Sequence, residues 1–166
     1  SYSNTGLTNG QTYYYRVYAT NSLGNSANSA TANTVAGDVP TTPTGLTATA
    51  VAGSQINLSW TASTANGYTV SAYTLQRSTD QTTWTGIYTG ATTSYSNTGL
   101  TNGQTYYYRV YATNSLGNSA NSATANTVAG DVPTSPTLTA TAVAGSTINL
   151  SWTTSTANGY TVSAYT

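Results

Sequence analysis

The chain has 166 residues, enough for one or two ordinary domains, and a hydrophobic content of 37% that is low but compatible with a packed core. Charged residues make up 4% of the sequence, the formal net charge is zero, and the three arginines form no cluster. This charge pattern argues against nucleic acid and anionic membrane surfaces as partners, and the lack of a long apolar run argues against membrane insertion.

The sequence repeats itself along the chain. Residues 1–44 recur at 94–137 with one difference, and residues 46–74 recur at 138–166 with two differences, so the period is about 93 residues. A period of this length is that of a whole domain rather than of a solenoid turn. The proline-containing segments at 38–43 and 131–136 are the expected linkers, because proline fixes an extended backbone.

We therefore predict three parts. Residues 1–39 are the C-terminal part (strands E to G) of one domain, residues 40–131 are a complete domain, and residues 132–166 are the N-terminal part (strands A to C) of the next. Neither end part can bury a core alone. We interpret the chain as a window from a longer array, the alternative being that neighbouring chains supply the missing strands.

The complete unit has strand character throughout and no predicted helix, because β-branched and aromatic residues alternate with polar ones between Gly and Asn-Gly turns. Expected strands cover 44–50, 54–61, a third segment ending near Ser78, 84–88, 94–98, 105–114 and 119–128. Seven short strands in about 90 residues favour a two-sheet sandwich.

Several motifs resemble a fibronectin type III domain, namely Pro43–Leu46, Trp60 in the second strand, Gly67–Tyr73, Leu100–Tyr106 and Tyr108–Ser119. The resemblance implies an all-β, seven-stranded, immunoglobulin-like sandwich with sheets A-B-E and C′-C-F-G. It also implies tandem near-identical repeats of the bacterial surface or secreted type. By similarity, the tyrosine corner that ties the E to F crossover is formed by Leu100 and Tyr106, and in the first copy by Leu7 and Tyr13.

The segment QTYYYRVYAT occurs at 11–20 and again at 104–113. Tyr106, Tyr108, Val110 and Ala112 are alternate residues of one strand and therefore face the same side of the sheet. Because Val110 and Ala112 are aliphatic, these four are predicted to point inward. The opposite face then carries Tyr107, Arg109 and Tyr111, and in the first copy Tyr14, Arg16 and Tyr18. These residues either cover the sheet or form an interaction face, since Tyr and Arg are enriched in interfaces and aromatic rings stack on sugars.

Chemically active residues are scarce. The chain has no Cys, His or Lys, and its acidic residues are Asp38, Asp80 and Asp131. Without paired carboxylates or a base to activate a nucleophile, no catalytic site, cofactor site or metal site is predicted, and an enzyme is not expected. Asn57 and Asn149 match the N-glycosylation pattern, but a match within a strand is common by chance.

Two functions are compatible with these features. The first is a structural repeat of an extracellular fibre, stalk or adhesin shaft, whose partners are neighbouring repeats of the same chain or of identical chains in a filament. The alternative is a carbohydrate-binding or spacer module of a secreted polysaccharide-degrading enzyme, with glycans as partners. Both place the protein outside the cell or at the cell surface, where a polar, nearly uncharged composition is common.

Overall fold

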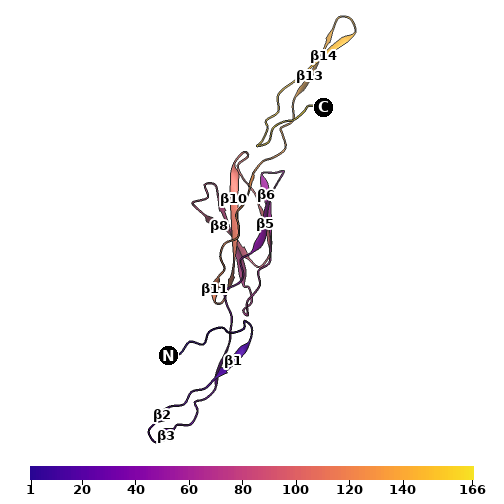
Figure 1. Ribbon diagram of the computed structural model, residues 1–166. Helices are drawn as coiled ribbons and strands as arrows, with labels where there is room; N and C mark the ends of the chain where they lie inside the picture. Colours follow the sequence, from indigo (N-terminus) through magenta and orange to yellow (C-terminus); the bar gives the residue numbers. More distant parts are fainter.

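The computed structural model describes all of residues 1–166, and every regular element in it is a strand. A central sandwich lies between two smaller β-structured ends, and the whole chain is elongated, with the β2/β3 turn at one extreme and the β13/β14 hairpin at the other (Figure 1). We call residues 1–39 the N-terminal flank and residues 132–166 the C-terminal flank.

The central sandwich is built from β5 (Thr44–Val51), β6 (Gln55–Thr61), β7 (Ala72–Ser78), β8 (Thr85–Gly90), β9 (Ser94–Asn97), β10 (Thr105–Asn114), β11 (Gly117–Asn118) and β12 (Ala125–Val128). One sheet has the order β5-β6-β9, and the other has the order β11-β10-β7-β8 with β12 also paired to β10. All pairings are antiparallel. The all-β sandwich predicted from the sequence is confirmed.

The core lies between the two sheets and follows the alternation of the strands. In β6, buried and exposed residues alternate, and in β10 every second residue is buried. The buried apolar side chains come mainly from these two strands and β7: Ile56, Leu58, Trp60, Tyr73, Leu75, Leu100, Tyr106, Tyr108, Val110, Ala112 and Ala129. Trp60 and Tyr73 meet edge to face with ring centroids 5.8 Å apart.

The last strand differs from the prediction of one continuous strand over 119–128. Within this range only β12 (125–128) is a strand, and β11 (117–118) precedes it, because two serine side chains take the place of backbone carbonyls between these two pieces. The N–H of Ala112 donates to the Ser119 hydroxyl (3.0 Å), and the N–H of Val110 donates to the Ser122 hydroxyl (3.1 Å). The backbone N–H groups along this edge of β10 therefore have hydrogen-bond acceptors, although the facing segment bends away from a regular ladder.

The flanks contain short two-stranded ladders. In the N-terminal flank β1 (Thr12–Tyr15) pairs with β4 (Ala32–Val35), and β2 (Thr20–Asn21) pairs with β3 (Gly24–Asn25). In the C-terminal flank β13 (Leu138–Val143) pairs with β14 (Thr147–Trp152).

Counterparts of the core residues are exposed in the flanks. Val17 is 70% exposed although its counterpart Val110 is fully buried, and Trp152 is 51% exposed although its counterpart Trp60 is 5% exposed. The same residues are buried only where a second sheet packs over them. The hydrophobic stabilisation of this chain therefore comes from the central sandwich.

Candidate functional site

The hydroxyl of Tyr106, the second residue of the central strand β10, holds the crossover from β9. The N–H of Thr101 donates to the Tyr106 hydroxyl (3.1 Å), and Leu100, beside it, is buried and donates its N–H to the Ser54 carbonyl (3.0 Å). These bonds tie the crossover to β10 and to the turn between β5 and β6. They fix where β10 starts and hence which of its residues face outward.

The same bond recurs in the N-terminal flank. There the N–H of Thr8 donates to the Tyr13 hydroxyl (3.0 Å), and Leu7 is half-buried. The bond therefore forms without an overlying second sheet, which indicates that it depends on the local sequence alone.

The outward face of β10 carries the predicted interaction residues. In register with β7, Tyr107 lies opposite Ser78, Arg109 opposite Gln76, and Tyr111 opposite Thr74. Tyr107, Arg109 and Tyr111 are half-buried, whereas the residues between them are buried. The three side chains thus lie in a row on the open surface of the four-stranded path through β8, β7, β10 and β11.

Arg109 is held in place by two neighbours on this face. Its guanidinium carbon lies 4.2 Å from the centroid of the Trp84 ring, and its Nε donates to the Gln76 amide oxygen (2.7 Å). The Trp84 ring is in turn anchored by its own N–H, which donates to the Gln81 carbonyl (3.1 Å). A planar cation stacked on an aromatic ring is therefore presented to solvent in a fixed orientation.

Sequence reasoning did not single out Trp84 or Gln76. Gln76 is found only once the register of β7 against β10 is known, because it is the residue opposite Arg109. Trp84 offers a weak signal: it directly precedes the short strand β8 and has no counterpart elsewhere in the repeats. We name Trp84, Gln76, Tyr107, Arg109 and Tyr111 the aromatic face.

The first copy of the triplet lies elsewhere, on the N-terminal flank (Figure 1). Tyr14 is 69% exposed, Tyr18 is 55% exposed, and Arg16 is exposed as well. Tyr14 lies opposite Asn33 in the ladder with β4, and Arg16 and Tyr18 lie beyond the end of β1. The structure does not bring the two triplets together, and the first one has no tryptophan stacked on its arginine.

The carboxylates with perturbed acidity are bound into turns. Asp80 accepts hydrogen bonds from the N–H groups of Thr83 and Thr82 and from the Ser78 hydroxyl, and these bonds lower its pKa well below the ordinary value.

No group of three or more His, Cys, Asp or Glu residues is arranged to hold a metal ion. The chain also has no helix long and apolar enough to cross a membrane.

Asp131 is held in a similar way at the end of the central sandwich. Its carboxylate accepts hydrogen bonds from the N–H groups of Gly53 and Val132 (2.8 and 2.7 Å), which lower its pKa. Because the bond to Gly53 reaches back to the turn between β5 and β6, this side chain fixes the path of the linker.

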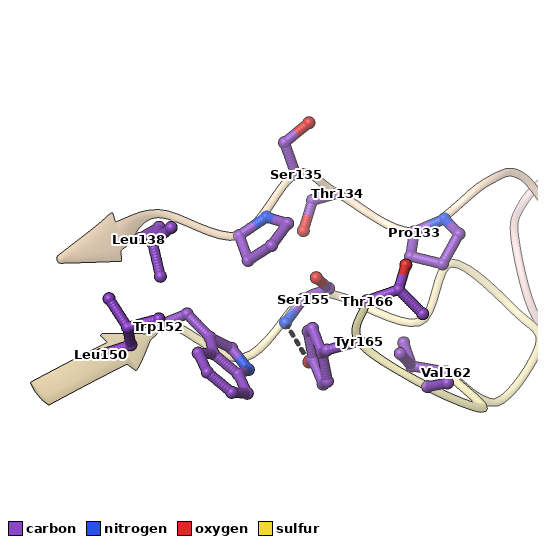
Figure 2. Close-up of a pocket in the computed structure, with 12 residues that line it drawn as sticks. Pro133, Thr134, Ser135, Leu138, Leu150, Trp152, Ser155, Val162, Tyr165 and Thr166 are labelled. Carbon is purple, nitrogen blue, oxygen red and sulfur yellow. Dashed lines mark hydrogen bonds between the residues drawn. The ribbon is translucent and has the colours of Figure 1, made fainter. Parts of the chain in front are cut away.

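A hollow of about 530 Å³ lies on the C-terminal flank, lined by Leu138, Leu150, Trp152, Val162 and Tyr165 among others (Figure 2). The N–H of Ser155 donates to the Tyr165 hydroxyl (2.8 Å), as that of Ser63 does to Tyr73 in the central sandwich (2.9 Å). The hollow is thus the uncovered counterpart of the sandwich core. We do not interpret it as a ligand site.

Two antiparallel sheets that face each other, with the crossover between them tied by a tyrosine hydroxyl, define an immunoglobulin-like sandwich domain. The family profile described as "Fibronectin type III domain" matches residues 41–128, which is more than half of the chain. The chain belongs to the fibronectin type III family.

Individual proteins extend this comparison. Exoglucanase B of Cellulomonas fimi is 33% identical over 126 residues, covering 72% of this chain and 11% of that protein. A crystal structure of titin domains is 25% identical with a TM-score of 0.55 and covers 70% of this chain and 40% of that one. The sixth fibronectin type III domain of a human protein is 26% identical with a TM-score of 0.50, covering 54% of this chain and 85% of that one.

Proposed function

We propose that this chain is a spacer module of a secreted polysaccharide-degrading enzyme. The observation that carries the proposal is the similarity to Exoglucanase B, which extends over 126 residues and therefore beyond a single sandwich domain. The name of that relative describes an enzyme that acts on a glucan. An enzyme that works on an extracellular polymer acts outside the cell, so we also propose an extracellular location.

The geometry supports spacing as the role. Polar groups in the structure are used to build turns and strand edges, as with Asp80 and the two serines of the last strand. The central sandwich separates the two flanks along the long axis of the chain (Figure 1). We propose no catalytic step for this chain itself.

We also propose that the flanks belong to adjacent repeats of the same domain. The support is their near-identity to the matching parts of the central sandwich, together with the same pairings: β1 with β4 corresponds to β10 with β12, and β13 with β14 corresponds to β5 with β6. On this proposal the module is an array of units in series.

The spacer role is tested on the native protein. Antibodies raised against this chain precipitate the protein from culture medium, and the precipitate is assayed for release of reducing sugar from a soluble β-glucan. We expect hydrolysis, with the activity on the same polypeptide as this sequence. Precipitates without hydrolytic activity that form regular filaments in electron microscopy would instead support the fibre, stalk or adhesin shaft and overturn the spacer role.

A second candidate is direct contact with the polysaccharide through the aromatic face. The observation that favours it is the stacked pair of Arg109 and Trp84, flanked by Tyr107 and Tyr111, because a row of rings with a fixed hydrogen-bond donor suits the apolar face and hydroxyls of a sugar. Any single contact of this kind is weak, and repetition along an array raises the avidity.

Glycan contact is tested by pull-down with insoluble cellulose, xylan and chitin. The variant is Tyr107→Ser/Tyr111→Ser, and the matched control is Tyr14→Ser/Tyr18→Ser, which removes tyrosines of the same sequence that have no stacked arginine. We expect retention of wild type and control and loss of retention in the variant. Equal, negligible retention of all three proteins discards glycan contact and leaves the spacer role unaffected.

A further inference from the structure

A tight loop of the central sandwich lies at the boundary with the N-terminal flank. The N–H of Tyr68 donates to the Ala65 carbonyl (3.2 Å), and both residues between them, Asn66 and Gly67, have positive φ (52° and 94°). This is the geometry of a turn that demands Asn-Gly. The identical loop at 157–160 has the same bond (3.2 Å) and the same backbone angles (50° and 96°).

At the first boundary this loop forms hydrogen bonds with the segment that leads out of the N-terminal flank. The N–H of Asp38 donates to the Asn66 carbonyl (3.0 Å), and the Asn66 side-chain amide donates to the Val39 carbonyl (2.8 Å). Two residues after Asn66, the Tyr68 hydroxyl donates to the Val35 carbonyl (2.8 Å). The loop therefore holds the linker at Asp38 and Val39 and also the preceding strand end at Val35. We call these contacts of 35–39 with 66–68 the first junction.

The second junction joins 128–132 to 158–160 and repeats each contact. The N–H of Asp131 donates to the Asn158 carbonyl (2.9 Å), and the Asn158 side-chain amide donates to the Val132 carbonyl (2.8 Å). The third bond, from the Tyr160 hydroxyl to the Val128 carbonyl, is 2.7 Å long. Each bond differs by 0.1 Å or less between the junctions. The arrangement is thus a property of the repeated sequence.

Glycines make the close approach in each junction. A Cβ on Gly67 would lie 2.7 Å from both the Ala36 carbonyl oxygen and the Gly10 nitrogen, and a Cβ on Gly37 would lie 2.6 Å from the Tyr68 ring. In the second junction a Cβ on Gly159 or Gly130 would meet the corresponding neighbours, Ala129, Gly103 and Tyr160, at 2.6–2.7 Å. Backbone of one unit therefore lies directly against backbone of the next, with no room for adjustment.

Further groups of the central sandwich enclose the first linker. The buried Asn114, at the end of β10, donates its side-chain amide to the Asp38 carbonyl (2.8 Å). Nearby, a Cβ on Gly117 would lie 3.3 Å from the Val39 side chain. The linker is thus contacted from two loops of the sandwich and cannot swing about its prolines as an isolated extended segment would.

We propose that the Asn-Gly-Tyr loop is a docking surface whose partner is the neighbouring unit of the same chain, so that consecutive units are locked in one fixed orientation. Every added unit then repeats the same junction, and an array forms a stiff rod with a constant step. This lock rests on the proposed array of repeats and on the junction contacts, and it holds whatever the array carries at its ends.

Amide hydrogen exchange of the 166-residue chain tests the lock, with the Asp38 and Asp131 amides as reporters of the two junctions. We expect both to be protected in the wild type. In Gly67→Ala the protection of Asp38 falls by about tenfold or more while that of Asp131 is unchanged, and Gly159→Ala shows the reverse. The control is Gly99→Ala, which also has positive φ (68°) but no neighbour within 4 Å, and which leaves both amides protected.

Orientation is measured separately by spin labels at two exposed positions, Thr31→Cys in the N-terminal flank and Thr83→Cys in the sandwich, in a chain that has no native cysteine. A single narrow distance distribution that broadens with Gly67→Ala supports the proposal. Fast exchange of Asp38 in the wild type, a broad wild-type distribution, or unchanged protection in Gly67→Ala overturns it. Should Gly67→Ala not fold, Tyr68→Phe replaces it, and unchanged Asp38 protection in that variant likewise overturns the lock.

Discussion

The Tyr108 hydroxyl offers a sharp test of how burial sets the strength of a hydrogen bond in this fold. Tyr108 is fully buried, and the side-chain amide of Asn97, itself 6% exposed, donates to its hydroxyl (3.0 Å). Tyr108→Phe keeps the ring but removes the acceptor. The amide of Asn97 is then left inside the sandwich without its hydrogen-bond partner.

The structure gives the size of the effect. Leaving a buried donor unsatisfied costs about 1–3 kcal/mol of the free energy of unfolding. For a domain of this size, about 2 kcal/mol corresponds to a fall in Tm of roughly 8–16 °C. The ring itself stays in place, so little is added for a cavity.

The chain contains its own matched control. Tyr15 is the sequence counterpart of Tyr108, and its hydroxyl accepts a hydrogen bond from the side-chain amide of Asn4 (3.1 Å), but the pair is exposed. Water replaces the lost bond in Tyr15→Phe, so we expect a change within about 0.5 kcal/mol. The assay is urea unfolding of the full chain, followed by tryptophan fluorescence, to which the buried Trp60 contributes together with Trp84 and Trp152.

A double variant distinguishes the effect of the lost hydrogen-bond acceptor on stability from any effect of the changed ring. In Asn97→Leu/Tyr108→Phe neither polar group is buried without a partner, so we expect part of the lost stability to return. Equal effects of Tyr108→Phe and Tyr15→Phe, or a double variant that is no more stable than Tyr108→Phe, would refute the reasoning.

Three further predictions concern the sandwich and its linker. Burial raises the pKa of Tyr108 to about 12 from 10.0. The protonated hydroxyl therefore contributes fully to stability below pH 10, and this contribution is lost as the pH rises to 12. In this pH range the urea midpoints of the wild type should fall more steeply than those of Tyr108→Phe. Ser122→Ala leaves the buried Val110 N–H without its acceptor and should cost about 1–3 kcal/mol in urea unfolding, whereas Ser29→Ala, the same change in the exposed flank, should cost little. The carboxyl of Asp131 should titrate with a midpoint below 3.8 in NMR, and an ordinary midpoint would show that its bonds do not form in solution.

The proposed lock and the proposed spacer role are related but separable. A flexible tether between two parts of an enzyme samples many distances, whereas a rod of locked units fixes the distance by the number of units. The repeated junction gives such a rod a constant step. Loss of the lock in Gly67→Ala would then alter spacing without changing the fold of each sandwich.

Much of the local structure follows from the sequence alone. Alternation gives the strands and their inward faces, and Asn-Gly gives the tight turn at Asn66, where two successive residues need positive φ. The serine-mediated edge of the last strand forms in both copies: Ser29 and Ser122 accept the N–H groups of Val17 and Val110, both at 3.1 Å. Identical residues make identical local bonds whether or not a core covers them.

Burial, in contrast, was decided only by tertiary structure, and the repeat in this chain shows it directly. The residues that form the ten-residue strand β10 against β7 form only the four-residue β1 and the two-residue β2 in the flank, where no β7 counterpart pairs with them. The stacking of Arg109 on Trp84 likewise depends on how β10 pairs with β7 and how β7 pairs with β8, because these pairings bring the two side chains together. A turn or a local hydrogen bond depends on neighbours along the chain, but burial and cross-strand contacts need two surfaces to meet, and that meeting is a property of the fold.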